Sequence, residues 1–176
     1  MKRARRNTGA SLVFGLLIER MTVYRLTKAA YADTAFRGSR GRGRWHEQGI
    51  PMVYAADQPA TALLETLVHT GRADLVATDY VLFRIKLDED AHVLTVPDES
   101  LPSNWQAWPW PASTQQIGTF WHEQHRSVAL SVPSAVVPMQ RNMLLNIQHP
   151  QFTALTIDGP TPSPVDTRLA TDSPSL

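Results

Sequence analysis

Apolar and polar residues alternate in several short segments of the chain, a pattern typical of half-buried β-strands. The clearest case is residues 79–87, where Val81, Phe83, Ile85 and Leu87 occupy every second position. The neighbouring residues 93–96 follow an acidic turn, and we expect them to pair with that strand. Further strands are predicted over residues 22–26, 51–56, 127–132, 142–145 and 152–157.

Two other segments predict helices. Apolar residues recur at helical spacing after Pro59, which suits a first helical turn because proline lacks the N–H that would be unpaired there. Asp57 is expected to cap this helix. Residues 113–116 have the spacing of a capping box and predict a helix that runs to about His125. Residues 101–111 are rich in Trp and Pro, which excludes a regular helix.

These elements predict an α+β protein with one domain. The strands and the two helices do not alternate regularly, which argues against a doubly wound parallel sheet. A chain of 176 residues that is 43% hydrophobic can bury one sizeable core. We place this domain at residues 21–157. Residues 158–176 are rich in Pro, Thr, Ser and Asp, and we expect them to form a disordered tail.

The formal net charge of +1 hides an uneven distribution along the chain. Residues 1–44 hold eleven of the 17 Lys and Arg residues and two of the 16 acidic residues, a balance of +9 that leaves −8 for the remainder. Residues 10–18 are apolar, but they are too few to span a membrane and no small-residue cleavage site follows them. We therefore expect residues 1–20 to be an upstream extension without a role in the fold.

The chain contains no cysteine, which excludes disulfides, thiolate metal sites and a cysteine nucleophile. This composition is compatible with a reducing cytoplasm. His122 and His125 are three residues apart, whereas the metalloprotease helix places its histidines four apart on one face. We expect no metal site.

Two arginines are candidates for binding phosphate. Arg25 lies on a predicted strand, and Arg44 follows Gly41 and Gly43 in a basic loop. A guanidinium group is permanently charged and planar, so it suits a pyrophosphate better than an ammonium group does. The alternative is that both are surface arginines without a ligand. The glycine spacing matches neither the P-loop nor the dinucleotide fingerprint.

Three further residues could contribute to a site. Tyr54 could present its ring to a planar base, or it could be an ordinary tyrosine of a sheet. Glu65 borders the apolar face of the first helix, where a carboxylate is costly to bury without a partner or a purpose. Ser134 follows Pro133 at the end of a strand and could project into a cleft, although a turn serine that bonds its own backbone is commoner.

The order and spacing of several segments resemble the RES domain, a family named for an Arg, a Glu and a Ser. The resemblance covers residues 22–157, and its family residues fall on Arg25, Glu65 and Ser134, with Ser127 and Ser131 close to the last. Where the family pattern leads us to expect Arg-Trp-Asn, this chain has His46 after Trp45, and where it leads us to expect Asn-Pro-x-His, this chain has Ile147 after Asn146. The segments that carry the resemblance are Val23-Tyr24-Arg25, Gly43-Arg44-Trp45, Val53-Tyr54-Ala55-Ala56, Ala62-Leu63-Leu64-Glu65, Ile117-Gly118, Val132-Pro133-Ser134 and residues 142–149.

This resemblance implies a bacterial, cytoplasmic toxin of a toxin–antitoxin pair with an ADP-ribosyltransferase-like fold of mixed or antiparallel sheets. Its implied reaction depletes NAD by cleaving the nicotinamide–ribose bond, with NAD as substrate and no further cofactor. Glu65 would stabilise the oxocarbenium-like sugar, Arg25 and Arg44 would hold the diphosphate, and Tyr54 and Ser134 would position the nicotinamide half. The implied partner is a cognate Xre-type antitoxin, which would provide the only link to nucleic acid.

Three alternatives stay open at this point. The acceptor of the ADP-ribose group could be water or phosphate, which would make the enzyme a glycohydrolase or a phosphorylase. It could instead be a protein, which would make the chain an ADP-ribosyltransferase. A third possibility is a non-catalytic module that binds nucleic acid through the basic loop of residues 37–44.

Overall fold

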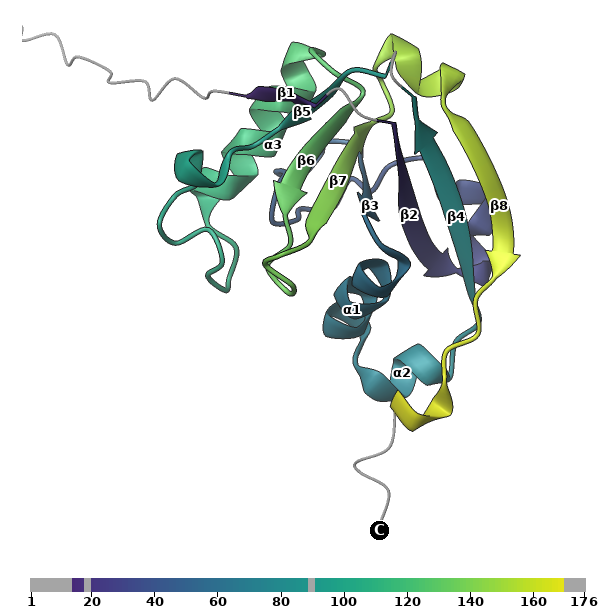
Figure 1. Ribbon diagram of the computed structural model, residues 1–176. Helices are drawn as coiled ribbons and strands as arrows, with labels where there is room; N and C mark the ends of the chain where they lie inside the picture. The colour runs from purple at the N-terminus through teal and green to yellow at the C-terminus, as the bar shows by residue number, and fades with distance from the viewer. Residues whose placement is uncertain (1–13, 18–19, 89–90, 170–176) are drawn as a thin grey trace, which may run out of the picture.

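The computed structural model describes residues 14–17, 20–88 and 91–169. Within them the strands form one sheet in the order β1-β5-β6-β7-β3-β2-β4-β8, and every neighbouring pair is antiparallel except β5 and β6 (Figure 1). The strands are β1 Gly15–Leu17, β2 Met21–Lys28, β3 Met52–Ala56, β4 Tyr80–Leu87, β5 Val93–Thr95, β6 Ala129–Pro133, β7 Arg141–Asn146 and β8 Thr156–Pro162. The α+β fold predicted from the sequence is confirmed.

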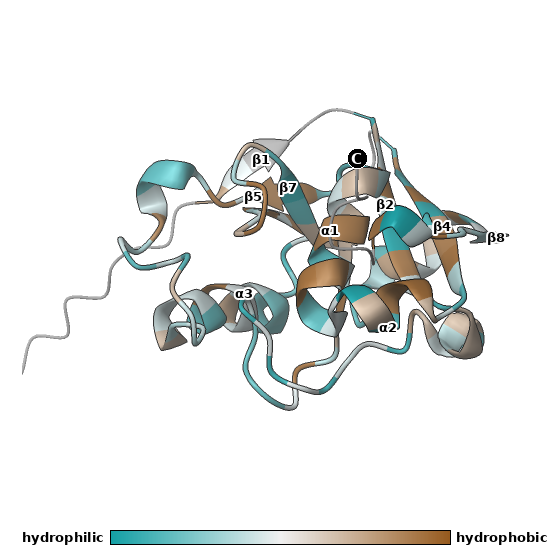
Figure 2. Cartoon of the chain, turned by 90° about the horizontal axis from the view of Figure 1, so that it is seen from below, coloured by the Kyte–Doolittle hydropathy of each residue, from teal (hydrophilic) through white to brown (hydrophobic). Residues whose placement is uncertain are grey.

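In the described part of the chain, three α-helices flank this sheet: α1 Pro59–Thr70, α2 Arg72–Val76 and α3 Ala112–Gln124. Seen from below in Figure 2, α1 and α2 lie between α3 on one side and β4 and β8 on the other. Helix α1 carries both hydrophobic and hydrophilic residues in this view, as expected of a helix with one face on the sheet. Short 3-10 segments cover Ala29–Thr34, Asp98–Ser100, Pro150–Ala154 and Thr167–Leu169.

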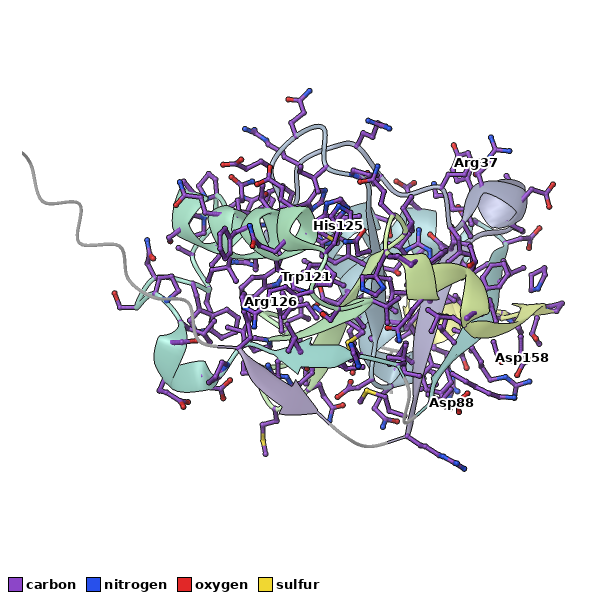
Figure 3. The ribbon with its side chains drawn as sticks, turned by 90° about the horizontal axis from the view of Figure 1, so that it is seen from above. Arg37, Asp88, Trp121, His125, Arg126 and Asp158 are labelled. Atoms are coloured by element: carbon purple, nitrogen blue, oxygen red, sulfur yellow. The ribbon has the colours of Figure 1, made fainter. Side chains whose placement is uncertain are left out.

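Both faces of the central strands are buried. On β7, Met143 and Leu145 belong to one apolar cluster, and Leu144 belongs to a second cluster that includes Trp121 of α3. This explains why β6 and β7 show nearly continuous apolar runs instead of alternation. Figure 3 shows Trp121 on the side of α3 that faces the sheet, where its Nε1 donates to Ser127 Oγ at 2.7 Å.

The sheet is nearly interrupted between β2 and β3. These strands share a single paired position, Tyr24 with Ala56, whereas β2 pairs with β4 along its whole length. Near this gap Arg25 donates a hydrogen bond from Nη1 to the Tyr54 carbonyl at 2.7 Å. A side chain thus takes the place of a backbone hydrogen bond, and the two strands diverge beyond it.

Both ends of the chain differ from the sequence predictions. The expected disordered tail is wrong for residues 158–169, because β8 pairs with β4 and Asp158 forms an ion pair with Lys86 at 3.2 Å. An edge strand needs backbone partners more than apolar side chains, which composition does not reveal. Residues 15–17 of the expected extension form β1 against β5. Residues 1–13, 18–19 and 170–176, which complete the two predicted segments, lie outside the described residues.

Three local predictions also need correction. Strand β5 pairs with β6 and β1 and not with β4, both of whose edges are taken by β2 and β8. Asp57 does not cap α1: Gln58 is the N-cap, and the Asp57 carboxylate accepts a hydrogen bond from the Arg141 backbone N–H at 2.9 Å. The capping box predicted at residues 113–116 is not formed either, because α3 begins at Ala112 and its N-cap is Pro111, which makes no side-chain capping bond.

Candidate active site

A cavity of about 450 Å³ opens where β2 and β3 diverge. Its walls come from these two strands, from α1, and from the loops that contain residues 39–46, 108–110 and 135–136. Four of the five residues proposed from the sequence line it: Arg25, Arg44, Tyr54 and Glu65. The volume falls within the range of about 300 to 1,000 Å³ that is usual for small-molecule sites.

Glu65 of α1 is held through one oxygen of its carboxylate. Oε1 accepts hydrogen bonds from Ser134 Oγ at 2.7 Å and from Asn142 Nδ2 at 2.6 Å. No side chain or backbone group of the described residues bonds Oε2. Because the carboxylate is fixed on one side, its second oxygen remains available to a ligand in the cavity.

Ser134, the fifth proposed residue, supports this carboxylate from behind the cavity wall. It is fully buried, and its Oγ accepts hydrogen bonds from the backbone N–H groups of Val136 at 3.1 Å and Val137 at 2.9 Å. With both lone pairs occupied and its proton directed to Glu65, this hydroxyl is unsuited to attack a substrate. The neighbouring serines act elsewhere, since Ser127 bonds Trp121 and Ser131 bonds Arg141.

Arg25 brings a partly desolvated positive charge to the cavity. Burial lowers its pKa to about 10, which still leaves the guanidinium charged at neutral pH. Apart from the Nη1 bond to the Tyr54 carbonyl, its Nε is buried without a hydrogen-bond partner. Since an unpaired buried donor is costly, an anionic ligand that accepts from this group would be bound favourably.

Arg44 connects the cavity to the loop of residues 101–111. Its Nη1 donates to the carbonyls of Trp105 at 2.5 Å and Ala107 at 3.1 Å. Burial lowers the pKa of Arg44, and the nearby Glu65 and Tyr54 oppose this shift. The arginine therefore adds positive charge to the site and fixes the position of a loop far away in the sequence.

The Tyr54 hydroxyl is fixed in the wall of the cavity. It accepts from the Trp45 N–H at 3.3 Å and contacts His46 Nδ1 at 2.7 Å. Burial raises the pKa of this hydroxyl and lowers the pKa of His46, so both groups are neutral at neutral pH. A Cβ at Gly43 would lie 2.7 Å from the hydroxyl, so the loop passes close to Tyr54 only because residue 43 is glycine.

Helix α3 holds the loop that carries Arg44. Gln115 Nε2 donates to the Gly43 carbonyl at 2.9 Å, and the Glu47 N–H donates to Thr119 Oγ1 at 3.0 Å. Between these contacts the helix approaches the loop so closely that a Cβ at Gly118 would lie 1.8 Å from the Trp45 carbonyl oxygen. Any larger residue at this position would displace the loop or the helix.

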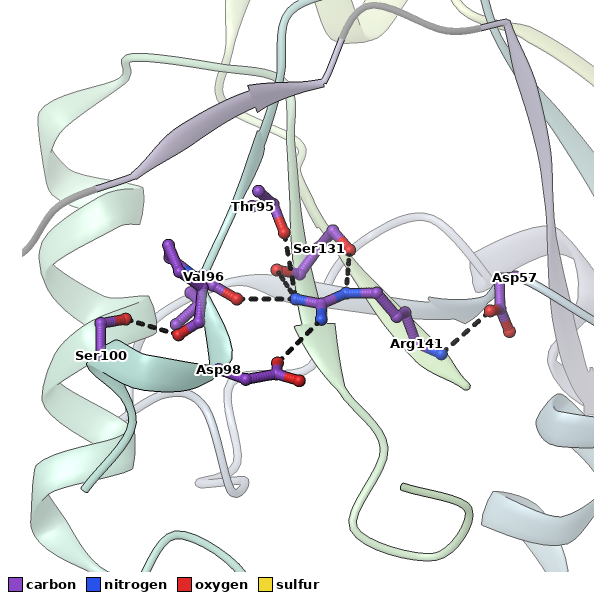
Figure 4. A network of polar contacts seen from close by, with 8 residues as sticks. Asp57, Thr95, Val96, Asp98, Ser100, Ser131 and Arg141 are labelled. Carbon is purple, nitrogen blue, oxygen red and sulfur yellow. Dashed lines mark hydrogen bonds and ion pairs between the residues drawn. The ribbon is translucent and has the colours of Figure 1, made fainter. Parts of the chain in front are cut away.

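Arg141 anchors the start of β7 beside Asn142 (Figure 4). Its guanidinium donates to Ser131 Oγ at 2.6 Å, to Thr95 Oγ1 at 3.0 Å and to the Val96 carbonyl at 2.8 Å, and it forms an ion pair with Asp98 at 3.2 Å. These bonds join β5, β6 and β7 at the point from which Asn142 reaches Glu65.

Sequence reasoning did not select Asn142, His46 or Trp108, all of which line the cavity. Asn142 could have been found, because it is a polar residue at the head of an otherwise apolar, buried strand. His46 and Trp108 lie in loops, where no periodic pattern predicts the direction of a side chain. Among the described residues, no group of three or more His, Asp or Glu residues is placed to hold a metal ion.

No helix within the described ranges is long and apolar enough to cross a membrane.

Comparison with known proteins identifies the family. A sequence model of the RES domain matches residues 22–166. A protein of Photorhabdus laumondii named Toxin Res is 41% identical over 130 residues, which cover 72% of this chain and 81% of the relative. A Toxin Res of Yersinia enterocolitica is 35% identical over 153 residues, covering 85% of this chain and 99% of the relative. A protein of a Sphingobium species named Prs ADP-ribosylating toxin is 35% identical over 112 residues, covering 61% and 68%.

The fold is also found in a solved structure. The crystal structure of the M. tuberculosis MbcT–MbcA toxin–antitoxin complex matches with a TM-score of 0.69 at 20% identity, over 85% of this chain and 87% of that chain. At this level of identity the match concerns the fold alone, and the sequence relatives establish the relationship. The chain belongs to the RES domain family, the family of the Res toxins.

Proposed function

We propose that this chain is the toxin of a toxin–antitoxin pair and that it depletes NAD by cleaving the nicotinamide–ribose bond. The observation that carries this proposal is the carboxylate of Glu65, which is oriented by Ser134 and Asn142 in a cavity that also contains Arg25 and Arg44. One oriented carboxylate together with two guanidinium groups matches a substrate in which a ribose adjoins a diphosphate.

The chemistry follows from this arrangement. When the C–N bond breaks, its electron pair leaves with the neutral nicotinamide and positive charge develops on the ribose. Glu65 Oε2 would stabilise that charge or accept a hydrogen bond from a ribose hydroxyl. Arg25 and Arg44 would hold the diphosphate and so fix the ribose against the carboxylate. Water or phosphate would then add to the sugar carbon and give ADP-ribose or its phosphate ester.

The test is release of nicotinamide from NAD by purified wild type and Glu65→Gln. Glutamine has the shape of glutamate, and its amide oxygen can still accept from Ser134 and Asn142, but the negative charge of Glu65 is lost. The rate should therefore fall by a factor of about 10² to 10³. Glu123→Gln, at an exposed position on α3, is the matched control and should retain full activity. Absence of nicotinamide release by the wild type, or full activity of Glu65→Gln, would refute the proposal.

Transfer of ADP-ribose to a protein is the second candidate, favoured by the relative named Prs ADP-ribosylating toxin. It uses the same bond cleavage and differs only in the acceptor. Identification of the products separates the cases: free ADP-ribose indicates hydrolysis, its phosphate ester indicates phosphorolysis, and radiolabel on protein indicates transfer. Equal nicotinamide release with and without a protein acceptor would argue against transfer.

An antitoxin partner is also proposed, supported by the toxin–antitoxin complex of similar fold. The resemblance to the RES domain alone suggests that this partner is of the Xre type. A toxin that consumes NAD must act where NAD is present, so we propose the cytoplasm as its compartment. The nucleic-acid-binding alternative is less well supported, because Arg42 and Arg44 of the basic loop line the cavity and Arg44 is bound to backbone carbonyls. Co-expression with a candidate cognate antitoxin tests the partner: the two proteins should co-purify, and the complex should release no nicotinamide from NAD.

A further inference from the structure

Two tryptophans lie at the mouth of the cavity, and the chemistry described so far gives them no role. Trp108 and Trp110 both line the cavity, and their rings pack edge to face with centroids 4.9 Å apart at 88°. Trp108 is 71% exposed, which is unusual for the largest apolar side chain unless it meets a ligand or a partner.

The loop that carries these rings is firmly anchored. Its Trp105 packs against the buried Trp45 with ring centroids 6.2 Å apart, and Arg44 binds the carbonyls of Trp105 and Ala107. Trp110 is also in contact with His69 of α1, at 6.4 Å between centroids. An exposed ring on a fixed loop is already oriented, so little conformational entropy is lost when a planar group stacks on it.

The position of the pair relative to Glu65 indicates which group could stack there. His69 follows Glu65 by four residues, a rise of about 6 Å along the helix. The contact from His69 to Trp110 then adds 6.4 Å. Trp110 therefore lies beside a residue one helical turn from Glu65, and Trp108 packs on Trp110. In a dinucleotide the nicotinamide is bonded directly to the ribose that Glu65 would contact, whereas the adenine is separated from that ribose by the diphosphate and a second ribose. Adenine is therefore the base that suits a ring placed one helical turn away from Glu65.

We propose that Trp108, supported by Trp110, is the stacking platform for the adenine base of the substrate. This inference rests on the proposed function and extends it, since it makes the enzyme selective for a dinucleotide over nicotinamide mononucleotide. Arg44 then has two roles, because it contributes charge for the diphosphate and fixes the loop on which the base stacks.

The experiment compares NAD with nicotinamide mononucleotide, which has the same scissile bond but no adenosine half. For Trp108→Ala, kcat/KM for NAD should fall about 5- to 100-fold, the range expected for loss of one ring that stacks on a base. For nicotinamide mononucleotide it should be unchanged. Trp108→Phe keeps an aromatic face and should recover most of the activity on NAD. Tyr31→Ala, at an exposed aromatic residue outside the cavity, is the control and should match wild type on both substrates.

Calorimetric binding of ADP gives a second readout that does not depend on bond cleavage. ADP should bind wild type and Trp108→Phe, and Trp108→Ala should bind it more weakly by the same factor as for NAD turnover. An equal loss of activity on both substrates would mean that Trp108 only supports the loop, and this would overturn the inference. The inference would also be overturned if Trp108→Ala turned over NAD like wild type. The same holds if ADP bound equally to wild type and both variants, or to none of them. A wild type that binds ADP through Trp108 but releases no nicotinamide would refute the proposed function and leave the adenine site intact.

Discussion

Replacement of Ser134 by alanine tests whether this serine positions Glu65 or takes part in bond cleavage. The variant removes the hydroxyl that donates to Glu65 Oε1 at 2.7 Å and accepts from the N–H groups of Val136 and Val137. A hydrogen bond to a charged group contributes about 1.5 to 3 kcal/mol, and each N–H left unpaired costs about 1 to 3 kcal/mol if it stays dry. Allowing for water at the partly buried positions, the free energy of unfolding should fall by about 3 to 5 kcal/mol.

The effect on the rate should be more moderate. Glu65 keeps its bond from Asn142 Nδ2 at 2.6 Å, so the carboxylate becomes looser but stays in the cavity. A small misplacement of a catalytic group lowers the rate by about 10² at most in such cases, and we expect a loss of about 10- to 100-fold per folded molecule. Urea unfolding followed by tryptophan fluorescence gives the stability, and nicotinamide release at low temperature gives the rate.

Asn142→Ala is the comparison variant. It removes the other bond to Oε1 but leaves the N–H groups of Val136 and Val137 paired with Ser134. We therefore expect a similar loss of rate with a smaller loss of stability. If Ser134→Ala unfolds like wild type, the hydrogen-bond argument is wrong. If instead its rate falls by much more than about 100-fold, the hydroxyl takes part in the chemistry and the positioning role is refuted.

Two further predictions concern stability. Gly118→Ala places a Cβ 1.8 Å from the Trp45 carbonyl oxygen, and because backbone atoms cannot move aside as a side chain can, the free energy of unfolding should fall by about 3 kcal/mol or more. Gly41→Ala is the control, because its Cβ meets only an ordinary contact at 3.5 Å and the variant should unfold like wild type. Equal urea midpoints for the two variants would contradict this prediction. Burial lowers the pKa of His46 from its usual value of 6.5. At pH values around and below 6.5 the unfolded chain therefore binds more protons than the folded protein, so the free energy of unfolding should decrease as the pH falls through 6.5. His46→Asn, which retains a polar group towards Tyr54, should show a shallower pH dependence, and an identical slope would count against the assignment.

The strands and helices were largely predictable because their signals are local. Alternation marked β4 to within one residue, and helical spacing after Pro59 marked the start of α1. The pairing of β5 was not predictable, since it depends on which sheet edges are free once distant strands have paired. The same holds for β8, an edge strand of mostly exposed residues whose composition resembles that of a disordered segment.

The site was predictable in part for a similar reason. The residues placed on strands and helices, such as Arg25 and Glu65, followed from the resemblance combined with the expected elements, and they do share a cavity. Their partners come from remote segments, as when Asn142 crosses 77 positions of the chain to reach Glu65. The resemblance supplied the residue types, and only the three-dimensional arrangement shows that Ser134 and Asn142 converge on one carboxylate oxygen.

The gap between β2 and β3 affects how an inert form of this protein should be made. Arg25 bridges the gap with its bond to the Tyr54 carbonyl. Replacing Arg25 by alanine would therefore remove a cation from the cavity and also weaken the connection between β2 and β3. Lost toxicity in such a variant could then reflect degradation in the cell as well as missing catalysis. Glu65 lies on α1 and takes no part in the contact between β2 and β3, so Glu65→Gln is the better choice for an inactive toxin to be expressed in quantity.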